Sequence, residues 1–369
     1  MNQNEFSTIK EEKSFSFKKY EKNNKLLAKK KFFFLLIFLL IIIIMEFIIL
    51  YFLKTNHYSR LQLDKNTITN IKETNRYKNK YDINFNYKDY DTEILTDKII
   101  RDSGWLLNID EAKFINGIIR KNKLKNCLEI GVAYGGSSIL ILNSIKDIEN
   151  SLLVSLDLNK ELYKDPNKLT GYRVNQYFPE LKKYWKLYTG DQPHKFLINL
   201  NIKFDFLFLD STHVTPGEIL NFIEALPFLK ENAIVIIHDL LWHFEKVINT
   251  KLFPSCISLI SVLYGDKVFL SPNNGVISNI GAVFLYSNQE EHYLDYFLLL
   301  LNFWEYIPKD EQINDLRIFI KKYYKNKNYI NIFDLAVTKN KKVHKKFIQS
   351  NIEEKKYLIG LGTKWNITN

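Results

Sequence analysis

Cys127 to Ser138 reads C-L-E-I-G-V-A-Y-G-G-S-S, and this stretch decides the fold of the chain. Its apolar start, Cys127–Ile130, predicts a short buried strand. A loop containing three glycines follows the strand. Ser137 and Ser138 then favour the start of a helix over the apolar run Ile139–Ile145. Strand, glycine loop and helix form the first unit of a doubly wound sheet that binds a nucleotide at the carboxyl ends of its strands.

The spacing of Gly131, Gly135 and Gly136 is G-x-x-x-G-G, which differs from the G-x-G-x-x-G of a dinucleotide-binding loop. Glu129 lies two residues before the first glycine. A carboxylate there would repel the pyrophosphate of NAD, whereas it would attract a cationic ligand. S-adenosylmethionine (SAM) carries a sulfonium and an ammonium group and no phosphate. The acidic residue therefore favours SAM over NAD.

Further strands and helices alternate along the chain, which implies a mainly parallel sheet covered by helices on both faces. Apolar runs predict further strands at Leu152–Leu156, Lys186–Tyr188, Phe204–Leu209 and Ala233–Ile237, and a closing antiparallel pair at Lys267–Leu270 and Ala282–Tyr286. Helices are expected at Glu111–Arg120 (capped by Asp110), His194–Leu200, Glu218–Leu226 and within residues 290–350. The predicted fold is α/β and Rossmann-like, with a seven-stranded sheet.

Acidic or polar residues follow most of these strands, at the edge where such folds place their ligand. They are Asp157 after the second strand, Asp191 and Gln192 after the third, Asp210 and His213 after the fourth, and His238 and Asp239 after the fifth. Asp157 is suited to the ribose hydroxyls of a nucleoside. Asp191 or Gln192 is suited to the amino group of adenine.

Together the motifs E-I-G-x-x-x-G-G, L-D, G-D, F-D-F-L-F-L-D-S-T-H and I-I-H-D resemble those of class I SAM-dependent methyltransferases, in the branch with small-molecule and sugar O-methyltransferases. The resemblance covers about residues 104–286. It implies cofactor contacts from Glu129, Gly131, Gly135, Asp157, Asp191 and Asp210. It also implies that Asp210 lies beside the reacting centre, where His213 and Asp239 are the other candidate catalytic residues.

Two departures from the family pattern bear on the chemistry. Glu231-Asn232-Ala233 replaces the usual Gly-Gly before the fifth strand, where Asn232 can supply a left-handed turn. Asp239-Leu240 stands where metal-dependent relatives have Asp-Asn, so one ligand is missing. Asp210 and Asp239, with His213 or His238 as a third ligand, still offer a divalent-cation site. The sequence favours metal-independent chemistry, with His213 or Asp239 as the base.

Length and composition agree with one large domain that carries appendages. The chain has 369 residues, of which 46% are hydrophobic, and a formal net charge of +11. Residues 1–92 hold 17 Lys and Arg against 10 Asp and Glu, so most of the excess lies there. No basic stripe typical of nucleic-acid binding stands out in the rest. Two cysteines cannot form a disulfide framework or, by themselves, a zinc site.

The N-terminal part predicts attachment to a membrane. Residues 1–31 are polar and basic, as in a disordered tail, and residues 32–53 are apolar except for Glu46. A helix of 22 residues spans about 33 Å, enough to cross a bilayer core of about 30 Å. Residues 54–92 predict a linker, residues 93–289 the SAM-binding domain, and residues 290–369 a helical extension packed on that domain.

The orientation of this span is left open. Eight lysines precede it within about 20 residues and four basic residues follow it, which favours a cytoplasmic N-terminus. The large domain would then lie across the membrane, although SAM is made in the cytosol. The chain is expected to be a single-pass membrane protein whose catalytic domain faces an unassigned side.

The sequence thus predicts a membrane-anchored SAM-dependent methyltransferase that methylates a hydroxyl of a small-molecule, sugar or lipid-linked acceptor. An NAD(P)-dependent oxidoreductase on the same sheet is one alternative, and Glu129 together with the missing G-x-G-x-x-G argues against it. The other alternative is a non-catalytic anchored scaffold with a decayed site, which the intact strand-end acids disfavour.

Overall fold

The structure is a computed structural model that describes residue 99 and residues 107–162, 165–241, 255–270 and 279–350. All of these residues belong to the second of two compact units, Asn79–Asn369. The predicted tail, the apolar run 32–53 and the linker lie outside the described residues. Among the helices that the structure does describe, none has the length and apolar character needed to cross a membrane.

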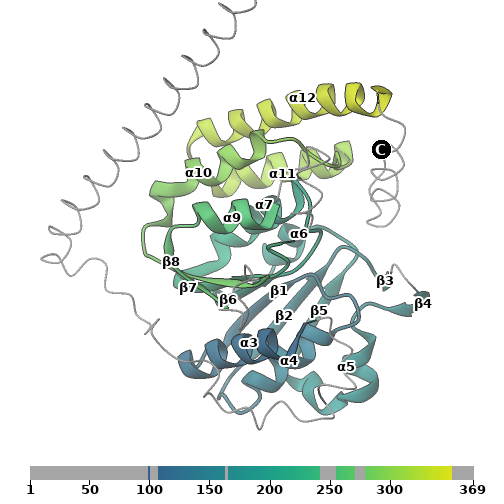
Figure 1. Cartoon of the computed structure of the whole chain (residues 1–369), viewed down its shortest axis with the longest axis vertical. Coiled ribbons are helices and arrows are strands. Elements are labelled where there is room, and N and C mark those ends of the chain that lie inside the picture. Colours follow the sequence, from purple (N-terminus) through teal and green to yellow (C-terminus); the bar gives the residue numbers. More distant parts are fainter. Residues whose placement is uncertain (1–98, 100–106, 163–164, 242–254, 271–278, 351–369) are drawn as a thin grey trace, which may run out of the picture. The chain divides into compact units, whose positions relative to one another are not determined.

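A seven-stranded sheet forms the centre of the described unit (Figure 1). Its strands, in spatial order, are β5 (Trp185–Thr189), β2 (Leu152–Asp157), β1 (Asn126–Ile130), β6 (Phe204–Leu209), β7 (Leu229–Ile237), β9 (Gly281–Leu285) and β8 (Gly265–Phe269). The pairs from β5 to β7 are parallel, whereas β9 pairs antiparallel with both β7 and β8. The sheet is therefore mixed, with the antiparallel closing pair that the sequence predicts.

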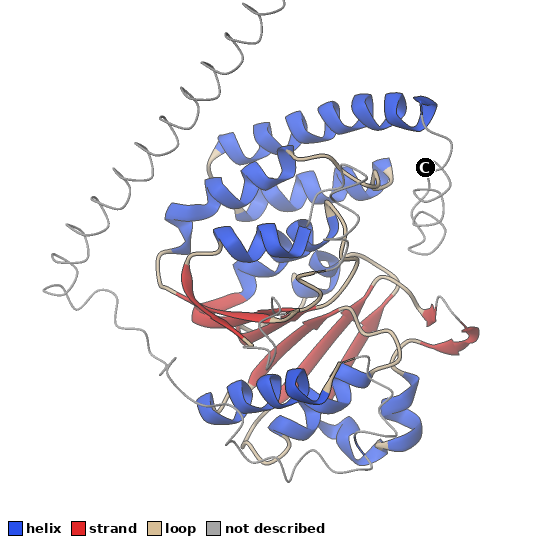
Figure 2. Cartoon of the chain, in the orientation of Figure 1, coloured by secondary structure: helices blue, strands red, loops and turns tan. Residues whose placement is uncertain are grey.

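Helices cover both faces of the sheet, which explains the nearly continuous apolar strands (Figure 2). On one face lie α3 (Ile109–Asn122), α4 (Gly136–Ile145) and α5 (Tyr172–Tyr177); on the other lie α6 (Pro193–Leu197), α7 (Gly217–Ala225), α9 (Ser255–Val262), α10 (Tyr293–Leu298), α11 (Asp310–Tyr323) and α12 (Lys327–Ser350). Two hydrophobic cores result, one on each face. All six side chains of β6 are buried between them.

Short elements complete the fold. A two-stranded hairpin, β3 (Glu161–Leu162) and β4 (Asp165–Leu169), follows β2. The described residues also include four 3-10 turns, at Pro179–Tyr184, Leu226–Phe228, Gln289–His292 and Leu299–Leu301. Asn232 adopts φ +59° inside β7, which confirms the left-handed turn expected where the family has glycine.

The start of α3 differs from the prediction. Asn108, and not Asp110, caps the helix: its side chain accepts a hydrogen bond from the Glu111 backbone, and Glu111 accepts one from the Asn108 backbone. This reciprocal arrangement is a capping box. It fixes Glu111 at the first turn of α3, beside the functional site described below.

The start of α4 also differs. The helix begins at Gly136, and its N-cap is Gly135 with φ +93°. Ser137 and Ser138 are therefore not caps. Their hydroxyls turn toward β1 instead, where they bind Glu129.

The helices within residues 290–350 are confirmed and pack in the same hydrophobic core as β6 and β7. Tyr324 donates a hydrogen bond from its hydroxyl to the Ile223 carbonyl of α7, at 2.6 Å. The Glu305 backbone N–H donates to the Thr215 carbonyl at 2.9 Å. These contacts place Tyr306 and the start of α11 against the carboxyl edge of the sheet. The predicted boundary near residue 290 stays a prediction.

Candidate active site

A cavity opens at the carboxyl edge of the parallel strands. It is lined by the loops after β1, β2, β5, β6 and β7, by α7 and by the segment that leads into α11. Five residues of the predicted site line this cavity: Gly131, Asp157, Asp210, His213 and Asp239. Glu129, Gly135 and Asp191 do not line it.

Glu129 lies beneath the glycine loop and has no exposed surface. Its carboxylate accepts hydrogen bonds from the hydroxyls of Ser137, Ser138 and Ser155, each at 2.6 Å. Burial raises the pKa of Glu129 to about 7, although the three serine hydrogen bonds act in the opposite direction. In this geometry Glu129 ties the loop and α4 to β2, and its predicted cofactor contact stays a prediction.

Gly131 is where the loop passes closest to β6. A Cβ placed on it would lie 1.9 Å from the Asp210 carbonyl oxygen, and the residue adopts φ +96°. Both the space and the backbone angle require glycine. The close passage brings the end of β1 against the start of the loop that carries Asp210 and His213.

Asp157 follows β2 and organises the loop above it. One carboxylate oxygen accepts hydrogen bonds from the Val132 and Ala133 backbone N–H groups, at 2.9 and 3.1 Å, and the other accepts one from Asn159 at 2.8 Å. Burial raises the pKa of Asp157, and these three hydrogen bonds oppose the rise. The carboxylate thus fixes the loop while facing the cavity.

The turn after β5 presents Gln192, and not Asp191, to the cavity. The Asp191 carboxylate accepts a hydrogen bond from the Gln192 backbone and lies 3.3 Å from Lys195 Nζ. Gln192 is 8% exposed, and its side-chain oxygen Oε1 has no hydrogen-bond partner. Of the two residues suggested for the adenine amino group, the structure therefore places Gln192 where it can act.

Asp210, His213 and Asp239 converge at the ends of β6 and β7. His213 Nε2 lies 3.3 Å from an Asp239 carboxylate oxygen and 3.7 Å from an Asp210 carboxylate oxygen. Each residue offers one ligand atom, and these atoms all lie within 4.8 Å of one another. The three side chains that the sequence assigns to catalysis thus form one cluster.

His238 packs behind this cluster and is 5% exposed. Its ring lies 3.3 Å from Asp210 and 3.5 Å from both Asp239 and Glu111. Burial acts to lower the pKa of His238, but these carboxylates outweigh it and hold the pKa well above the usual value. Burial likewise acts to raise the pKa of Asp210, but His238 and His213 bring it below the usual value. His238 therefore stabilises Asp210 as a carboxylate.

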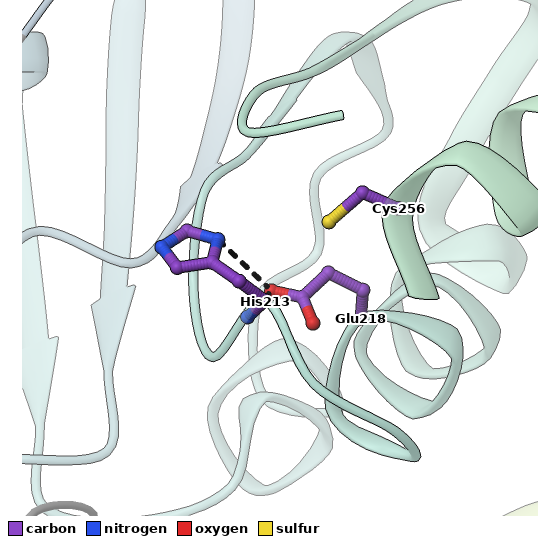
Figure 3. A group of neighbouring side chains, drawn as sticks. All are labelled: His213, Glu218 and Cys256. Carbon is purple, nitrogen blue, oxygen red and sulfur yellow. Dashed lines mark hydrogen bonds and ion pairs between the residues drawn. The ribbon is translucent and has the colours of Figure 1, made fainter. Parts of the chain in front are cut away.

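Two further side chains, Glu218 and Cys256, lie near the Nδ1 side of the His213 ring (Figure 3). His213 Nδ1 lies 3.7 Å from a Glu218 carboxylate oxygen, and Cys256 of α9 points toward the same carboxylate. Glu218 already accepts hydrogen bonds from Ser211, Thr212 and the His213 backbone. Burial raises the pKa of the Cys256 thiol well above its usual value, so it is not the thiolate that a metal requires. The role of Glu218 is therefore structural: its hydrogen bonds hold the loop after β6 in place.

Residues 128–240 match the family model described as "Methyltransferase domain". This part of the chain therefore resembles a methyltransferase domain. The match begins in β1, ends just after Asp239 and includes every element that contributes a predicted site residue. A comparison of the sequence with curated proteins finds no match.

The chain is also similar to solved structures. The O-methyltransferase from Bacillus cereus in complex with SAH is 17% identical, with a TM-score of 0.39, over 52% of this chain and 89% of that one. TomG, an O-methyltransferase from Streptomyces achromogenes in complex with SAM, is 14% identical, with a TM-score of 0.39, over 52% and 90%. The SAH-bound Podospora anserina methyltransferase PaMTH1 is 16% identical, with a TM-score of 0.37, over 52% and 89%.

The site contains polar residues that the sequence does not single out. Glu111 reaches His238 from α3, while His194 and Glu224 form a buried pair 2.8 Å apart beside Gln192. A buried glutamate within an apolar helix such as α7 is a detectable signal, since Glu is seldom fully buried without a partner. Its partner His194 lies 30 residues away and only the fold reveals it.

Proposed function

We propose that the chain is a SAM-dependent O-methyltransferase that methylates an uncharged hydroxyl compound. The observation that carries the proposal is the cluster of Asp210, His213 and Asp239 at the strand ends, in the same cavity as Asp157. If the ribose of SAM is held at Asp157, the sulfonium attached to that ribose would lie toward the cluster. Relatives in complex with SAM or SAH agree with this choice of cofactor.

The cavity fits SAM in three respects. Gly131 leaves room at the loop that a Cβ would fill, as expected where a ligand or backbone approaches closely. Asp157 faces the cavity at the end of β2, where its carboxylate can accept hydrogen bonds from ribose hydroxyls. No Lys or Arg is among the described residues that line the cavity, which suits a cofactor that carries positive charge and no phosphate.

SAM supplies an activated methyl group, so the protein has to align the acceptor and take its proton. His213 Nε2 is the proposed proton acceptor because it faces the cavity and lies beside two carboxylates. Asp239 and Asp210 would stabilise the imidazolium that forms when the hydroxyl proton arrives. As the acceptor oxygen took the methyl group and SAH left, His213 would hold the hydroxyl proton and then pass it to solvent.

A divalent cation is the alternative use of the same cluster. The oxygen and imidazole donors of Asp210, His213 and Asp239 suit such an ion, with Asp239 already oriented by a hydrogen bond from the Asn279 amide at 2.8 Å. A bound cation would lower the pKa of the acceptor hydroxyl. Loss of turnover in EDTA that Mg²⁺ restores would favour it over the metal-independent route that we propose.

The charge of the cavity bears on the acceptor. Five carboxylates line it: Asp157, Glu161, Asp210, Glu224 and Asp239. A phosphate or carboxylate on the acceptor would meet these groups with no lining Lys or Arg, among the described residues, to offset them. His238 also lines the cavity and its raised pKa favours a charged ring, but Glu111, Asp210 and Asp239 already surround that ring. A sugar or phenol hydroxyl without an anionic group is therefore the proposed substrate class.

The test is to titrate the full chain, purified in mild detergent, with SAM and with S-adenosylhomocysteine (SAH), and then with NADH. Binding of SAM and SAH with no NADH fluorescence quenching supports the proposal. NADH binding would favour the oxidoreductase, and failure to bind any of the three would favour the scaffold. Release of SAH can then be measured against matched neutral and phosphorylated sugars, where faster turnover of the phosphorylated set would contradict the acceptor class.

Membrane attachment remains part of the proposal and is supported by the apolar sequence of residues 32–53 alone. Fractionation of cells that express the full chain, with and without residues 32–53, tests it. The full chain should sediment with membranes and resist extraction by carbonate. Equal partition of both forms would remove the anchor from the proposal.

A further inference from the structure

Helices α11 and α12 form an antiparallel pair on the side of the sheet that α10 covers. Helix α12 packs against α10 and α11, and it lies beyond α10 as seen from the sheet (Figure 1). Two ion pairs join it to α11: Asp334 to Arg317 at 2.7 Å, and Lys341 to Asp310. The residue numbers rise along α11 as they fall along α12, so the two helices run in opposite directions.

The outer side of this helix pair exposes two large apolar side chains. Ile318, which directly follows Arg317, is 67% exposed, and Leu335, which directly follows Asp334, is 57% exposed. In antiparallel right-handed helices, a step of one residue beyond two facing residues turns to the same side of the pair. Ile318 and Leu335 therefore lie on one surface, which the hydrophobic core does not cover.

Exposed lysines surround these two side chains. Helix α11 contributes two of them, the connection 324–326 one, and α12 three: Lys321, Lys322, Lys325, Lys327, Lys342 and Lys345. Of the four acids in the two helices, Asp310, Asp315 and Asp334 are held in ion pairs with other described residues, which leaves Glu311. The six lysines and the two apolar side chains, here called the basic face, thus form a strongly positive surface. Its residues are far apart in sequence, and only the packing of the helices brings them together.

Apolar side chains among lysines suit an anionic membrane surface. Lysines are attracted to anionic headgroups, and the apolar side chains of such a face enter the boundary between headgroups and acyl chains. A nucleic acid would bring its phosphates to the lysines but would leave Ile318 and Leu335 uncovered. The combination of charge and exposed apolar surface therefore favours lipid.

We propose that the basic face is a docking surface for anionic lipid, in addition to the proposed anchor at residues 32–53 and independent of the proposed catalysis. Gln312 of α11 lines the cavity at the strand ends, so docking would bring that cavity close to the headgroups. If residues 32–53 anchor the chain, the tether raises the local concentration of the basic face at the bilayer, and a weak contact is then sufficient.

The test locates the basic face relative to lipid in the full chain. Asn331→Cys adds a thiol on the exposed side of α12, one turn before Leu335, and Glu149→Cys adds an exposed thiol after α4, on the other face of the sheet. The native thiols of Cys127 and Cys256 are buried, so a fluorescent label reacts with the added one. Each labelled chain is reconstituted with vesicles that carry a quencher on the lipid headgroup.

The vesicles consist of phosphatidylcholine, alone or with about one third phosphatidylglycerol. In the anionic vesicles the label at Asn331 should be quenched at least about threefold more than the label at Glu149, because lysines hold the basic face at the charged surface. The difference should disappear in phosphatidylcholine and at about 1 M salt. Equal quenching of the two labels, or a difference that does not require phosphatidylglycerol, would overturn the proposal.

The outcome is separable from the anchor. Insertion of the full chain into both kinds of vesicle without preferential quenching at Asn331 would support the anchor and overturn the basic face. If residues 32–53 do not insert, the full chain should still bind the anionic vesicles and not the neutral ones, with the same preferential quenching.

Charge reversal tests the lysines directly. Lys321→Glu combined with Lys342→Glu should remove the preferential quenching at Asn331. Lys182→Glu combined with Lys183→Glu makes the same change of charge on exposed lysines of the turn Pro179–Tyr184 and should retain it. Thermal unfolding of both double variants verifies the fold. Loss of the quenching in both variants, or in neither, would contradict the role of the basic face.

The apolar side chains distinguish lipid from nucleic acid. Ile318→Ser combined with Leu335→Ser should weaken the quenching, because the contact with the acyl boundary is lost while the lysines remain. A labelled oligonucleotide provides the comparison. Its binding, lost in the Lys321 and Lys342 double variant and retained in the serine double variant, would assign the surface to nucleic acid if no preferential quenching by lipid occurs, and it would then overturn the proposal.

Discussion

His213 Nε2 lies 3.3 Å from the Asp239 carboxylate, and both residues adopt left-handed backbone angles, φ +59° and +53°. Such angles are unfavourable for residues other than glycine and concentrate at functional sites. The two residues follow neighbouring parallel strands, where Leu209 pairs with Ile237. The backbone therefore turns sharply after each of these strands, and the two turns direct the His213 and Asp239 side chains toward each other across the cavity.

His213→Asn tests the proposed proton acceptor. Asparagine tolerates the left-handed angle but cannot take a proton, so kcat should fall by about 10²–10⁴-fold. SAH affinity should stay within about threefold of the unmodified chain. Steady-state kinetics and calorimetry measure the two effects. His292→Asn, on a histidine stacked on Tyr264 outside the cavity lining, is the control and should change neither. An equal loss of turnover and affinity would contradict the role.

Asp157→Asn and Asp157→Ala separate two roles of this carboxylate. It can bind ribose, and it also accepts the N–H groups of Val132 and Ala133. Alanine should weaken SAH binding by about 1.5–3 kcal/mol or more, since the loop loses its acceptor together with the ligand. Asparagine keeps one acceptor oxygen and should lose less. Calorimetry gives the affinities and hydrogen exchange at Val132 reports the loop. Unchanged affinity in both variants would remove Asp157 from the site.

The sequence predicts the sheet well because its strands are short apolar runs bounded by polar residues, as in Phe204–Leu209. The acids at the strand ends could be assigned to one cavity because parallel strands end at the same edge. Four residues assigned in this way do line the same cavity: Asp157, Asp210, His213 and Asp239. The match of residues 128–240 to a methyltransferase domain covers the same elements.

Other features depend on contacts between distant segments, which no local pattern reports. Ser137 and Ser138 resemble caps in sequence, yet the buried carboxylate of Glu129 attracts their hydroxyls. Asp191 precedes Gln192 by one residue, and only the direction of the turn decides that Gln192 faces the cavity. The His194–Glu224 pair joins residues 30 positions apart.

Glu129→Gln should alter how stability depends on pH. Burial raises the pKa of Glu129 to about 7, above its value in the unfolded chain, so the folded state binds the extra proton between about pH 4.5 and 7. The free energy of unfolding of the unmodified chain should therefore fall as pH rises through 7. Glutamine does not titrate, so the variant should gain about 2.5 kcal/mol relative to the unmodified chain between pH 5 and 8. Urea unfolding at both pH values measures this, and parallel curves would contradict it.

Both cysteines should be inert in the folded protein. Cys127 and Cys256 are the two cysteines of the sequence, and burial raises the pKa of each thiol well above its usual value. Reaction with a thiol reagent at pH 8 should therefore require unfolding. Titration in buffer and in denaturant should detect no thiol and two thiols, respectively. Fast reaction of one thiol in buffer would show that its surroundings open readily.

Gly131→Ala should be more disruptive than Gly135→Ala, although both glycines have positive φ, +96° and +93°. A Cβ on Gly131 would lie 1.9 Å from the backbone oxygen of Asp210, whereas one on Gly135 would have 3.1 Å to its nearest neighbours. Backbone strain is thus shared, and the difference between the variants reports the clash.

Gly131→Ala should lower the free energy of unfolding by more than about 2 kcal/mol, since β1 and β6 must separate at the loop. Gly135→Ala should cost about 1–2 kcal/mol, mostly from the backbone angle, because its neighbours Gly171 and Val174 have to move much less than the Asp210 backbone beside Gly131. Because the displaced strand carries Asp210, Gly131→Ala should also abolish SAH binding at temperatures where the variant is still folded. Thermal unfolding and calorimetry on the pair measure both effects, and equal destabilisation would show that β6 yields to the added methyl group.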